Sequence, residues 1–343
     1  MEQNLLELQH VNFSFHTYGG VVKAVRDVSF DVREGEILGI VGESGCGKSV
    51  TAQCILRLNP EPPGFFEGGS ITYKGEELLK KTDKEMRVIR GTEIGFIFQD
   101  PMTSLNPTMK IGEQIEEIFM KDRSISKQER KKRALEILQL VGMSDGEKRY
   151  KQYPHELSGG MKQRIMIAIA LVGKPSIIIA DEPTTSLDVT IEAQILDLLK
   201  ELQKKFHSSI ILITHDLGVI AKMCDRVLVM YGGKIVERGT VDDIFYQTKH
   251  PYTAGLLKSI TRLDSGKNEK LTPIEGTPPD LFSPPKGCPF AARCEYAMDI
   301  CNEQMPEQYH LSEEHETSCW LEHEYSPQVE LGNCTVREVK DHE

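Results

Sequence analysis

The sequence predicts an α/β fold in which helices cover both faces of a parallel sheet. Three observations support this prediction. Short, nearly continuous apolar runs alternate with helical segments in the second half of the chain, as in strands buried on both faces. A glycine-rich loop joins an early apolar strand to a helix-compatible run. Between them, near residues 110–172, the apolar residues follow helical spacing, which indicates a helical insertion.

The elements follow one another in a simple order. The first 75 residues predict a small sheet, with strands at residues 5–15, 21–32, 36–41 and 69–74. After the helical insertion, strands are expected at residues 177–180, 209–214 and 226–230, and a long helix at 190–206. The regular pattern ends near Gly266, and the proline-rich stretch 272–289 predicts a linker or an irregular wrap.

Charge divides the 343 residues unevenly. Residues 1–260 contain 34 basic and 35 acidic side chains, whereas residues 261–343 contain 7 and 17. Five of the eight cysteines and the single tryptophan also lie in this acidic part. We therefore expect two differently composed units. The chain is acidic overall, and its basic cluster, Lys127–Arg133, fits a solvated helix face. We therefore do not expect nucleic acid as a partner.

Membrane-spanning and secreted proteins are also disfavoured. The longest apolar run, Ile165–Val172, is too short to span a bilayer. The N-terminus lacks the basic start and apolar stretch of a secretory signal, so we expect a reducing cytosol, in which disulfides are rare.

A phosphate-binding loop is predicted at residues 42–49, between the apolar strand 37–41 and a helix-compatible run. We call this segment the phosphate loop; it consists of Gly42, Glu43, Ser44, Gly45, Cys46, Gly47, Lys48 and Ser49. Its glycines let successive backbone N–H groups face phosphate oxygens, while Lys48 reaches the β and γ phosphates and Ser49 ligates Mg²⁺. The alternative, an ordinary glycine-rich turn, does not account for the strand and helix on either side. The loop therefore predicts a nucleoside triphosphate site.

An acidic pair ends the apolar strand at residues 177–180. Asp181 is positioned to hold Mg²⁺, and Glu182 to act as general base for an attacking water. Acidic residues at a strand end are usually only solvated. The phosphate loop elsewhere in the chain favours the catalytic interpretation.

The run L-S-G-G-M-K-Q at residues 157–163 resembles the signature of ATP-binding-cassette (ABC) ATPases. On physical grounds it is a second anion-binding turn at a helix start. The resemblance implies that Ser158, Gly159, Gly160 and Gln163 contact ATP held by a second ATPase subunit. It also implies a P-loop NTPase core with an antiparallel β subdomain and a helical subdomain, followed here by an irregular cysteine-rich C-terminal segment.

Further positions match this family in the correct order. Gln99 matches a glutamine that senses Mg²⁺ and the membrane subunit, Asp188 the D-loop aspartate, and His215 the histidine that contacts the γ-phosphate. The family also stacks an aromatic side chain on adenine. Phe15 is the first choice for that role and Tyr18 the second, although Phe13 or Phe15 could equally belong to the core. The Cys46 thiol is interpreted as incidental, since the backbone at this position does the binding.

Three longer runs narrow the resemblance to ATPase subunits of oligopeptide and dipeptide importers, a group whose relatives import nickel. These runs are Q-D-P-M-T-S-L-N-P from Gln99, H-P-Y-T-A-G-L-L from His250, and G-C-P-F-A-A-R-C from Gly287. The resemblance implies a peripheral subunit at the cytoplasmic face of the membrane. Its implied partners are a second ATPase subunit, identical or paralogous, two transmembrane permease subunits and, indirectly, an extracytoplasmic substrate-binding protein. A soluble ABC ATPase of DNA repair or translation is the rival, but the usual second cassette, coiled-coil insertion or basic arms are missing.

Four cysteines in the acidic part predict a metal centre. Cys288, Cys294, Cys301 and Cys319 have the spacing C-x5-C-x6-C-x17-C. This spacing leaves zinc and iron–sulfur about level, with free thiols as a third possibility. The importer resemblance implies a [4Fe–4S] cluster with a structural or redox-sensing role. Cys334 and the acidic tail have no assigned function.

The expected domains follow from these observations. Residues 1–260 would form the nucleotide-binding domain, with a helical subdomain at about 100–172. Residues 261–326 would form the importer-type segment with the cysteines, and residues 327–343 the acidic tail.

Overall fold

A computed structural model describes residues 4–120, 124–185, 187–259, 273–329 and 331. The chain divides into two compact units, each built from separate stretches. Unit 1 comprises Met1–Leu5, Val32–Ile37 and Lys80–Ile213, and unit 2 comprises Leu6–Asp31, Leu38–Leu79 and Thr214–Glu343. In the part of the chain that the structure describes, no helix has both the length and the apolar character needed to cross a bilayer. Cys334 lies outside the described residues.

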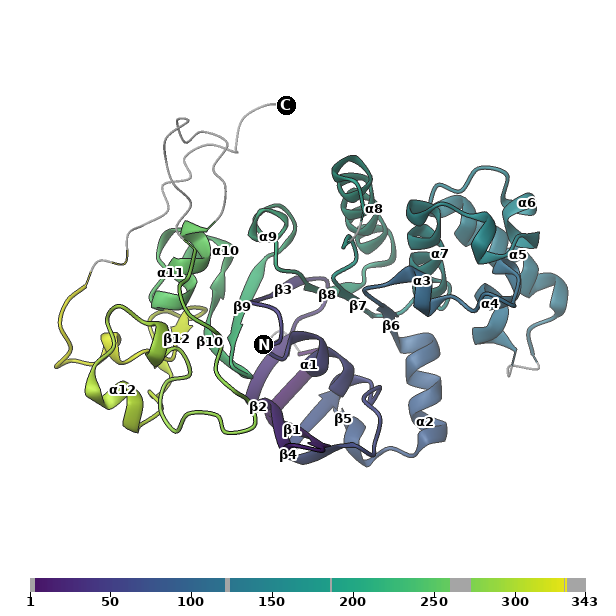
Figure 1. The fold of residues 1–343 in the computed structure, drawn as a ribbon. Helices are drawn as coiled ribbons and strands as arrows, with labels where there is room; N and C mark the ends of the chain where they lie inside the picture. Colours follow the sequence, from purple (N-terminus) through teal and green to yellow (C-terminus); the bar gives the residue numbers. More distant parts are fainter. Residues whose placement is uncertain (1–3, 121–123, 186, 260–272, 330, 332–343) are drawn as a thin grey trace. The chain divides into compact units, whose positions relative to one another are not determined.

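Unit 1 contains three parallel strands, β6 (Ile94–Ile97), β7 (Ile177–Asp181) and β8 (Ser209–Ile213) (Figure 1). Every residue of β7 and β8 is buried, which explains their continuous apolar sequence. Helix α7 (Gly159–Leu171) approaches β6 closely, because a Cβ atom on Gly95 would lie 2.4 Å from the carbonyl oxygen of Ala170. Helix α8 (Val189–Phe206) buries one face through leucines and isoleucine. The predicted strands 177–180 and 209–214 and the helix 190–206 are confirmed.

Helices fill the rest of unit 1. They are α2 (Asp83–Val88), the π-helical η2 (Ile89–Glu93), α3 (Pro101–Ser104), α4 (Ile111–Glu116), the 3₁₀ turn η3 (Glu117–Phe119), α5 (Lys127–Leu140), α6 (Gly146–Lys151) and the 3₁₀ turn η4 (Pro154–Glu156). Ser126 begins α5, and its side chain accepts the Glu129 N–H. The stretch predicted as helical is therefore helical.

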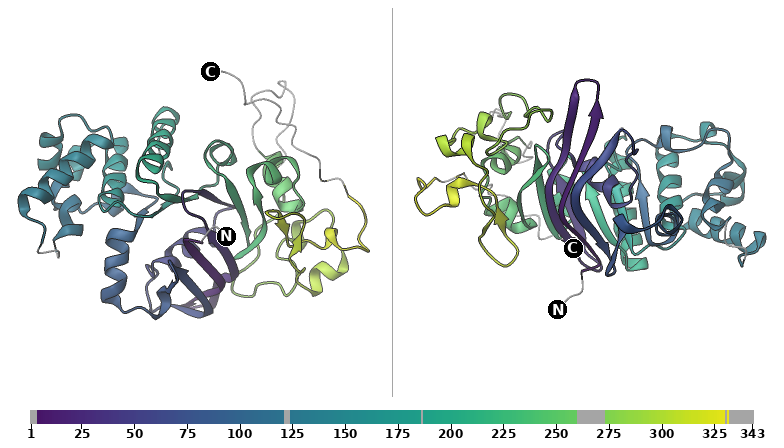
Figure 2. Two further views of the ribbon diagram at one scale, coloured as in Figure 1. Left: turned by 180° about the vertical axis from the view of Figure 1, so that it is seen from behind. Right: turned by 90° about the horizontal axis from the view of Figure 1, so that it is seen from below.

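Unit 2 carries an antiparallel sheet in the order β2-β1-β4-β5. Its strands are β1 (Leu6–Thr17), β2 (Gly20–Val32), β4 (Gly64–Tyr73) and β5 (Glu76–Glu77), followed by the 3₁₀ turn η1 (Leu78–Lys80). Figure 2 shows β1 and β2 as a long purple hairpin. Leu8 pairs with Ile71 across β1 and β4, and both side chains are buried. The small N-terminal sheet is confirmed, except that the strand expected at residues 36–41 lies in the other sheet, described next.

The second sheet of unit 2 contains a strand that the sequence analysis does not predict. Strand β3 (Ile37–Val41) runs parallel to β9 (Arg226–Tyr231), but β10 (Lys234–Thr240) runs antiparallel to β9. The physical reason is the two-residue turn at Gly232 and Gly233, both of which have positive φ. Such a turn reverses the chain and makes the two strands antiparallel, because parallel strands need a longer crossover connection.

The C-terminal segment continues this sheet. Two short strands, β12 (Glu316–Thr317) and β11 (Tyr309–His310), extend it beyond β10 in antiparallel order. The segment expected to be irregular thus contains some regular structure, including the 3₁₀ turn η5 (Ala291–Arg293), helix α12 (Asp299–Glu303) and the 3₁₀ turn η6 (Trp320–Glu322). It packs within the same unit as the phosphate loop.

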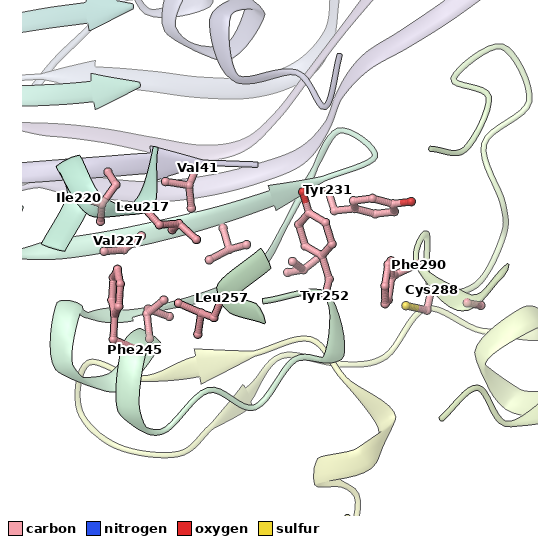
Figure 3. Close-up of a cluster of buried hydrophobic side chains, with 14 of the residues drawn as sticks. Val41, Leu217, Ile220, Val227, Tyr231, Phe245, Tyr252, Leu257, Cys288 and Phe290 are labelled. Atoms are coloured by element: carbon pink, nitrogen blue, oxygen red, sulfur yellow. The ribbon is translucent and has the colours of Figure 1, made fainter. Parts of the chain in front are cut away.

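A hydrophobic core joins the C-terminal segment to this sheet. Figure 3 shows Tyr231 of β9 beside Tyr252 of α11 (Pro251–Lys258), with Phe290 and Cys288 of the C-terminal segment nearby. The rings of Tyr231 and Tyr252 lie 4.5 Å apart between centroids, and each lies 5.3 Å from Phe290. Helices α1 (Lys48–Ile55), α9 (Leu217–Met223) and α10 (Val241–Tyr246) complete unit 2.

Candidate nucleotide site

The phosphate loop has the backbone that a phosphate cradle requires. It connects β3 to α1, and Gly42, Gly45 and Gly47 have φ of 152°, 79° and 101°. Side chains are also excluded by space: a Cβ atom on Gly42 would lie 2.2 Å from the Met230 carbonyl oxygen. Glycine is therefore needed at Gly42 for both conformation and packing. The curled backbone leads into the N-terminus of α1, where N–H groups and the helix dipole favour an anion.

Lys48 is held inside the loop. Its side chain is buried, and Nζ donates hydrogen bonds to the carbonyl oxygens of Gly42 (2.7 Å) and Glu43 (3.0 Å). An ammonium group has three donors; the two carbonyl bonds orient it, and the third donor makes only a long contact to Cys46 Sγ at 3.9 Å. Ser49 follows at the start of α1, as its predicted role as a Mg²⁺ ligand requires. The loop lies between a strand and a helix as the sequence predicts, and the binding roles of its residues stay a prediction.

Cys46 is buried within the same loop. Its N–H donates to the carbonyl oxygen of Glu43, and its own carbonyl oxygen accepts from the N–H of Gly233. Burial raises the pKa of the thiol above its usual value. The backbone of Cys46 therefore contributes to loop structure while the thiol remains neutral, in keeping with the interpretation of this thiol as incidental.

Two residues that sequence reasoning did not connect to the loop hold Glu43. The hydroxyl of Tyr252 accepts the Glu43 N–H at 2.8 Å, and the Arg293 guanidinium donates to both carboxylate oxygens at 2.6 and 3.0 Å. The Glu43 N–H is thus engaged within the protein. Tyr252 and Arg293 both occur in runs that carried the family resemblance, H-P-Y-T-A-G-L-L and G-C-P-F-A-A-R-C. That resemblance was the sequence signal by which these two residues could have been found.

The acidic pair of unit 1 has a distinctive backbone. Asp181 is buried at the end of β7, and Glu182 adopts the left-handed conformation with φ of 45°. The Glu182 N–H donates to the carbonyl oxygen of Ile213, which holds this backbone next to β8. A non-glycine residue in this conformation carries strain, and such residues concentrate at functional sites.

The structure brings Gln99 and Glu182 together. Gln99 Nε2 and Thr185 Oγ1 each donate to Oε2 of Glu182, both at 2.9 Å. These two donors orient the carboxylate that the sequence predicts as general base. Gln99, Asp181 and Glu182 together offer amide and carboxylate oxygens, the hard donors that Mg²⁺ prefers.

His215 belongs to unit 2, as the phosphate loop does. It is exposed in the turn between Thr214 and α9. The next residue, Asp216, caps α9 through its carboxylate, which accepts the N–H groups of Gly218 and Val219. This cap fixes the turn that carries His215.

The signature residues lie at the N-terminus of α7. Ser158 is exposed and caps the helix by accepting the Met161 N–H, with Gly159 and Gly160 as the first helical residues. Gln163 differs, because its side chain is buried and does not share the exposed surface of Ser158. Asp188 is exposed at the N-cap of α8. Ser186, two residues before Asp188, lies outside the described residues.

The aromatic candidates for adenine stacking differ in exposure. Phe13 is fully buried and belongs to the core. Phe15 is partly buried, with its ring edge-to-face against Phe13 at 5.1 Å, whereas Tyr18 is fully exposed in the β1–β2 turn. Phe15 stays the prediction for the adenine contact.

The four cysteines of the C-terminal segment are free thiols that lie within electrostatic reach of one another. The pKa of the Cys319 thiol is raised by burial first and then by Cys288, Cys294 and Cys301. Burial raises the pKa of Cys288 to about 12, with smaller contributions from Cys301 and Cys294. Among the described residues, no group of three or more His, Cys, Asp or Glu side chains has the arrangement of a metal-ion site.

Backbone N–H groups point at all four sulfur atoms. The donors belong to Phe290 and Ala291 for Cys288, Tyr296 for Cys294, Met298 for Cys301 and Leu321 for Cys319. Such hydrogen bonds stabilise thiolates and tune iron–sulfur groups. These N–H groups suit thiolates, but the described residues include no group of three or more side chains arranged to hold a metal ion, so the metal centre stays a prediction.

Two family models match the chain. A model described as ABC transporter matches residues 25–185, and one described as the C-terminal region of oligopeptide/dipeptide transporters matches residues 236–301. The first match contains the phosphate loop and the acidic pair, and the second contains Tyr252, Arg293 and three of the four cysteines.

Curated relatives match along nearly the whole length. The oligopeptide transport ATP-binding protein OppD of Bacillus subtilis (strain 168) is 58% identical over 326 residues, which cover 95% of this chain and 91% of the relative. The dipeptide transport ATP-binding protein DppD of the same organism is 56% identical over 320 residues, covering 93% and 95%.

Solved structures match the cassette part. The ATP-binding cassette MJ0796, in a dimeric post-hydrolysis state bound to ADP and Pi, is 30% identical with a TM-score of 0.61, covering 69% of this chain and 98% of that one. CbiO1 from Clostridium perfringens, part of the ABC transporter complex cbiONQ, is 27% identical with a TM-score of 0.61, covering 71% and 91%.

Proposed function

Because the chain belongs to the family of ABC transporter ATP-binding proteins that serve oligopeptide and dipeptide transport, we propose that it is the ATP-hydrolysing subunit of a peptide importer. The observation that carries the chemistry is the phosphate loop, whose glycine backbone and enclosed Lys48 form an anion cradle at the start of α1. The cargo, dipeptides or oligopeptides, is inferred from the names of the relatives. Nickel or another small solute is the alternative cargo.

The residues of the chain divide the work of hydrolysis. The phosphate loop and Lys48 bind the β and γ phosphates, and Phe15 stacks on adenine. Ser49, Asp181 and Gln99 would hold Mg²⁺, which neutralises charge that develops on the phosphates. Water attacks the γ-phosphorus, its proton passes to the Glu182 carboxylate, and ADP leaves.

His215 and Gln99 assist that step. His215 contacts the γ-phosphate, and Gln99 orients the Glu182 carboxylate by the hydrogen bond described above. The strained backbone of Glu182 supports this assignment, since strain at a strand end is retained where a side chain must point in one direction.

A second ATPase subunit completes the site. Ser158, Gly159 and Gly160, together with Asp188, would face the ATP bound by that partner, which is either a paralogue or another copy of this chain. The predicted contact of Gln163 is not supported by its buried side chain. The exposed helix start at Ser158 supports this role, because its N–H groups can meet an anion from outside. The pair would drive two permease subunits from the cytoplasmic face of the membrane, with a substrate-binding protein delivering cargo on the other side.

The proposed domains follow the sequence expectation. Residues 1–260 form the nucleotide-binding domain with the helical subdomain at about 100–172. Residues 261–326 form the importer-type segment, and residues 327–343 the tail.

Cys288, Cys294, Cys301 and Cys319 would hold a [4Fe–4S] cluster with a structural or redox-sensing role. The mutual proximity of the thiols and the N–H groups at each sulfur support this assignment. Anaerobically purified protein should be brown and contain about four iron atoms per chain. Colourless, iron-free protein would contradict the cluster, and bound zinc in its place would identify a zinc site.

Co-expression tests the transporter assignment. The full chain should be recovered with membranes when peptide-importer permease subunits are co-expressed, and should remain in the supernatant when they are absent. Equal recovery in the supernatant under both conditions would favour a soluble ABC ATPase instead.

A further inference from the structure

Arg293 is the most completely bonded cation of the C-terminal segment. Its side chain is 5% exposed and makes five hydrogen bonds, which equals the number of its N–H donors. Two go to the carboxylate of Glu43 and one to the Tyr231 hydroxyl. The other two go to the carbonyl oxygens of Glu275 and Ile274. The guanidinium is therefore held in position by three groups besides Glu43.

Glu43 is held at every polar group of its residue. Its carboxylate is paired with Arg293, its N–H donates to Tyr252, and its carbonyl oxygen accepts from Lys48 and from the Cys46 N–H. The chain of contacts thus runs from Arg293 through Glu43 to the ammonium group that binds phosphate. Arg293 and Lys48 are thus linked through a single residue, Glu43.

The contact between Arg293 and Glu43 also changes the electrostatics of the phosphate loop. Glu43 is a carboxylate inside a loop built for a triphosphate, so its negative charge opposes the anion that the loop must bind. The bidentate pairing with Arg293 neutralises that charge at close range. The carboxylate is only 26% exposed, so water screens an unpaired charge there weakly.

The C-terminal segment is also fixed against the hairpin that carries Phe15. The Lys23 N–H donates to the Leu281 carbonyl oxygen at 2.9 Å, and Arg26 donates to the Pro285 carbonyl oxygen at 3.2 Å. These contacts belong to the same unit as the phosphate loop. The segment is therefore anchored to the hairpin a few residues before Arg293.

We propose that Arg293 is a positioning residue for ATP: by neutralising and holding Glu43 it sets the phosphate loop, so that the C-terminal segment controls nucleotide affinity. This inference rests on the proposed function in one respect, namely that the phosphate loop binds ATP. Arg293 lies between Cys288 and Cys294, in the turn η5.

A double-mutant cycle tests the proposal on the full-length chain. The variants are Arg293→Met, Glu43→Gln and their combination, with Arg293→Lys as a milder substitution that keeps the charge. The matched control is Arg238→Met, because Arg238 pairs with Glu316 and so also links the body of unit 2 to the C-terminal segment, away from the loop. ATP affinity is measured by competition with a fluorescent ATP analogue, and thermal stability without nucleotide.

We expect Arg293→Met to weaken ATP binding about tenfold, or about 1.4 kcal/mol, and to raise KM for ATP more than it lowers kcat. Adding Glu43→Gln should restore part of the affinity, since the unpaired carboxylate is then removed. Arg293→Lys should weaken binding by a smaller factor, which keeps the test valid if Arg293→Met fails to fold. Arg238→Met should leave ATP affinity unchanged even if it lowers thermal stability.

Lys48→Ala separates this inference from the proposed function. Unchanged affinity in both Arg293 variants, with binding lost in Lys48→Ala, would overturn the inference and leave the ATPase assignment standing. Equal losses in Arg293→Met and Arg238→Met would also overturn it, because the effect would then reflect general loosening of the segment. Retained ATP binding in Lys48→Ala would overturn the proposed function and the inference with it.

Discussion

Replacing Glu182 by Gln should abolish ATP turnover while ATP binding persists. Two hydrogen bonds to this side chain, from Gln99 and Thr185, end on the single oxygen Oε2. The amide oxygen of glutamine can accept the same two bonds, so the substitution preserves the local structure and removes only the ability to take a proton. General acid–base catalysis contributes about 10²- to 10⁴-fold to rate, so turnover should fall by that factor, or about 3–5 kcal/mol in activation free energy.

The assay pairs phosphate release with ATP binding on the same preparation. Glu129→Gln is the control, because Glu129 is a carboxylate of the same unit that also accepts a side-chain hydrogen bond, from Arg133. This control should retain normal turnover and binding. Undiminished turnover in Glu182→Gln would refute the role of general base. Loss of ATP binding together with turnover would refute the structural argument, since the substitution would then have disturbed the nucleotide site.

Two further predictions concern buried groups. Burial lowers the pKa of His250 to about 4, so between pH 6.5 and 4 the unfolded chain binds a proton that the folded chain does not. The free energy of unfolding should therefore fall with decreasing pH, by up to about 1.4 kcal/mol per pH unit from this group. Denaturant titrations of His250→Asn, which keeps a cap acceptor for α11, should show a shallower decline of this free energy with pH. Equal slopes in the variant and the unmodified chain would contradict the pKa assigned to His250. A bulky maleimide should react slowly with buried Cys46 and, once attached, block ATP binding, with Cys46→Ala as the insensitive control. Full ATPase activity after verified modification of Cys46 would contradict this prediction.

The parts of the site that sequence could predict are local. A strand, a glycine loop and a helix follow one another within residues 37–55, and the acidic pair directly follows β7, so contiguous residues carry both signals. The helical stretch was predictable for the same reason, since its apolar spacing is a local property. Gly232 and Gly233 also offer a local signal for the antiparallel strand β10, which the apolar pattern of the other strands does not predict.

Other features depend on contacts between distant residues. Arg293 and Glu43 are 250 positions apart, and Tyr252 lies 209 positions from the N–H that it accepts. Neither pairing leaves a periodic pattern in the sequence. The burial of Gln163 and the left-handed backbone of Glu182 likewise result from packing around α7 and β7, which no single stretch of sequence specifies.

The central claim, that this chain powers peptide import, is tested most directly by uptake measurements in a strain from which its gene is deleted. We expect that strain to lose uptake of labelled dipeptides and oligopeptides and to keep normal nickel uptake. The intact gene should restore peptide uptake, and the Glu182→Gln variant should not. Loss of nickel uptake with normal peptide uptake, or full peptide uptake with Glu182→Gln, would contradict the account.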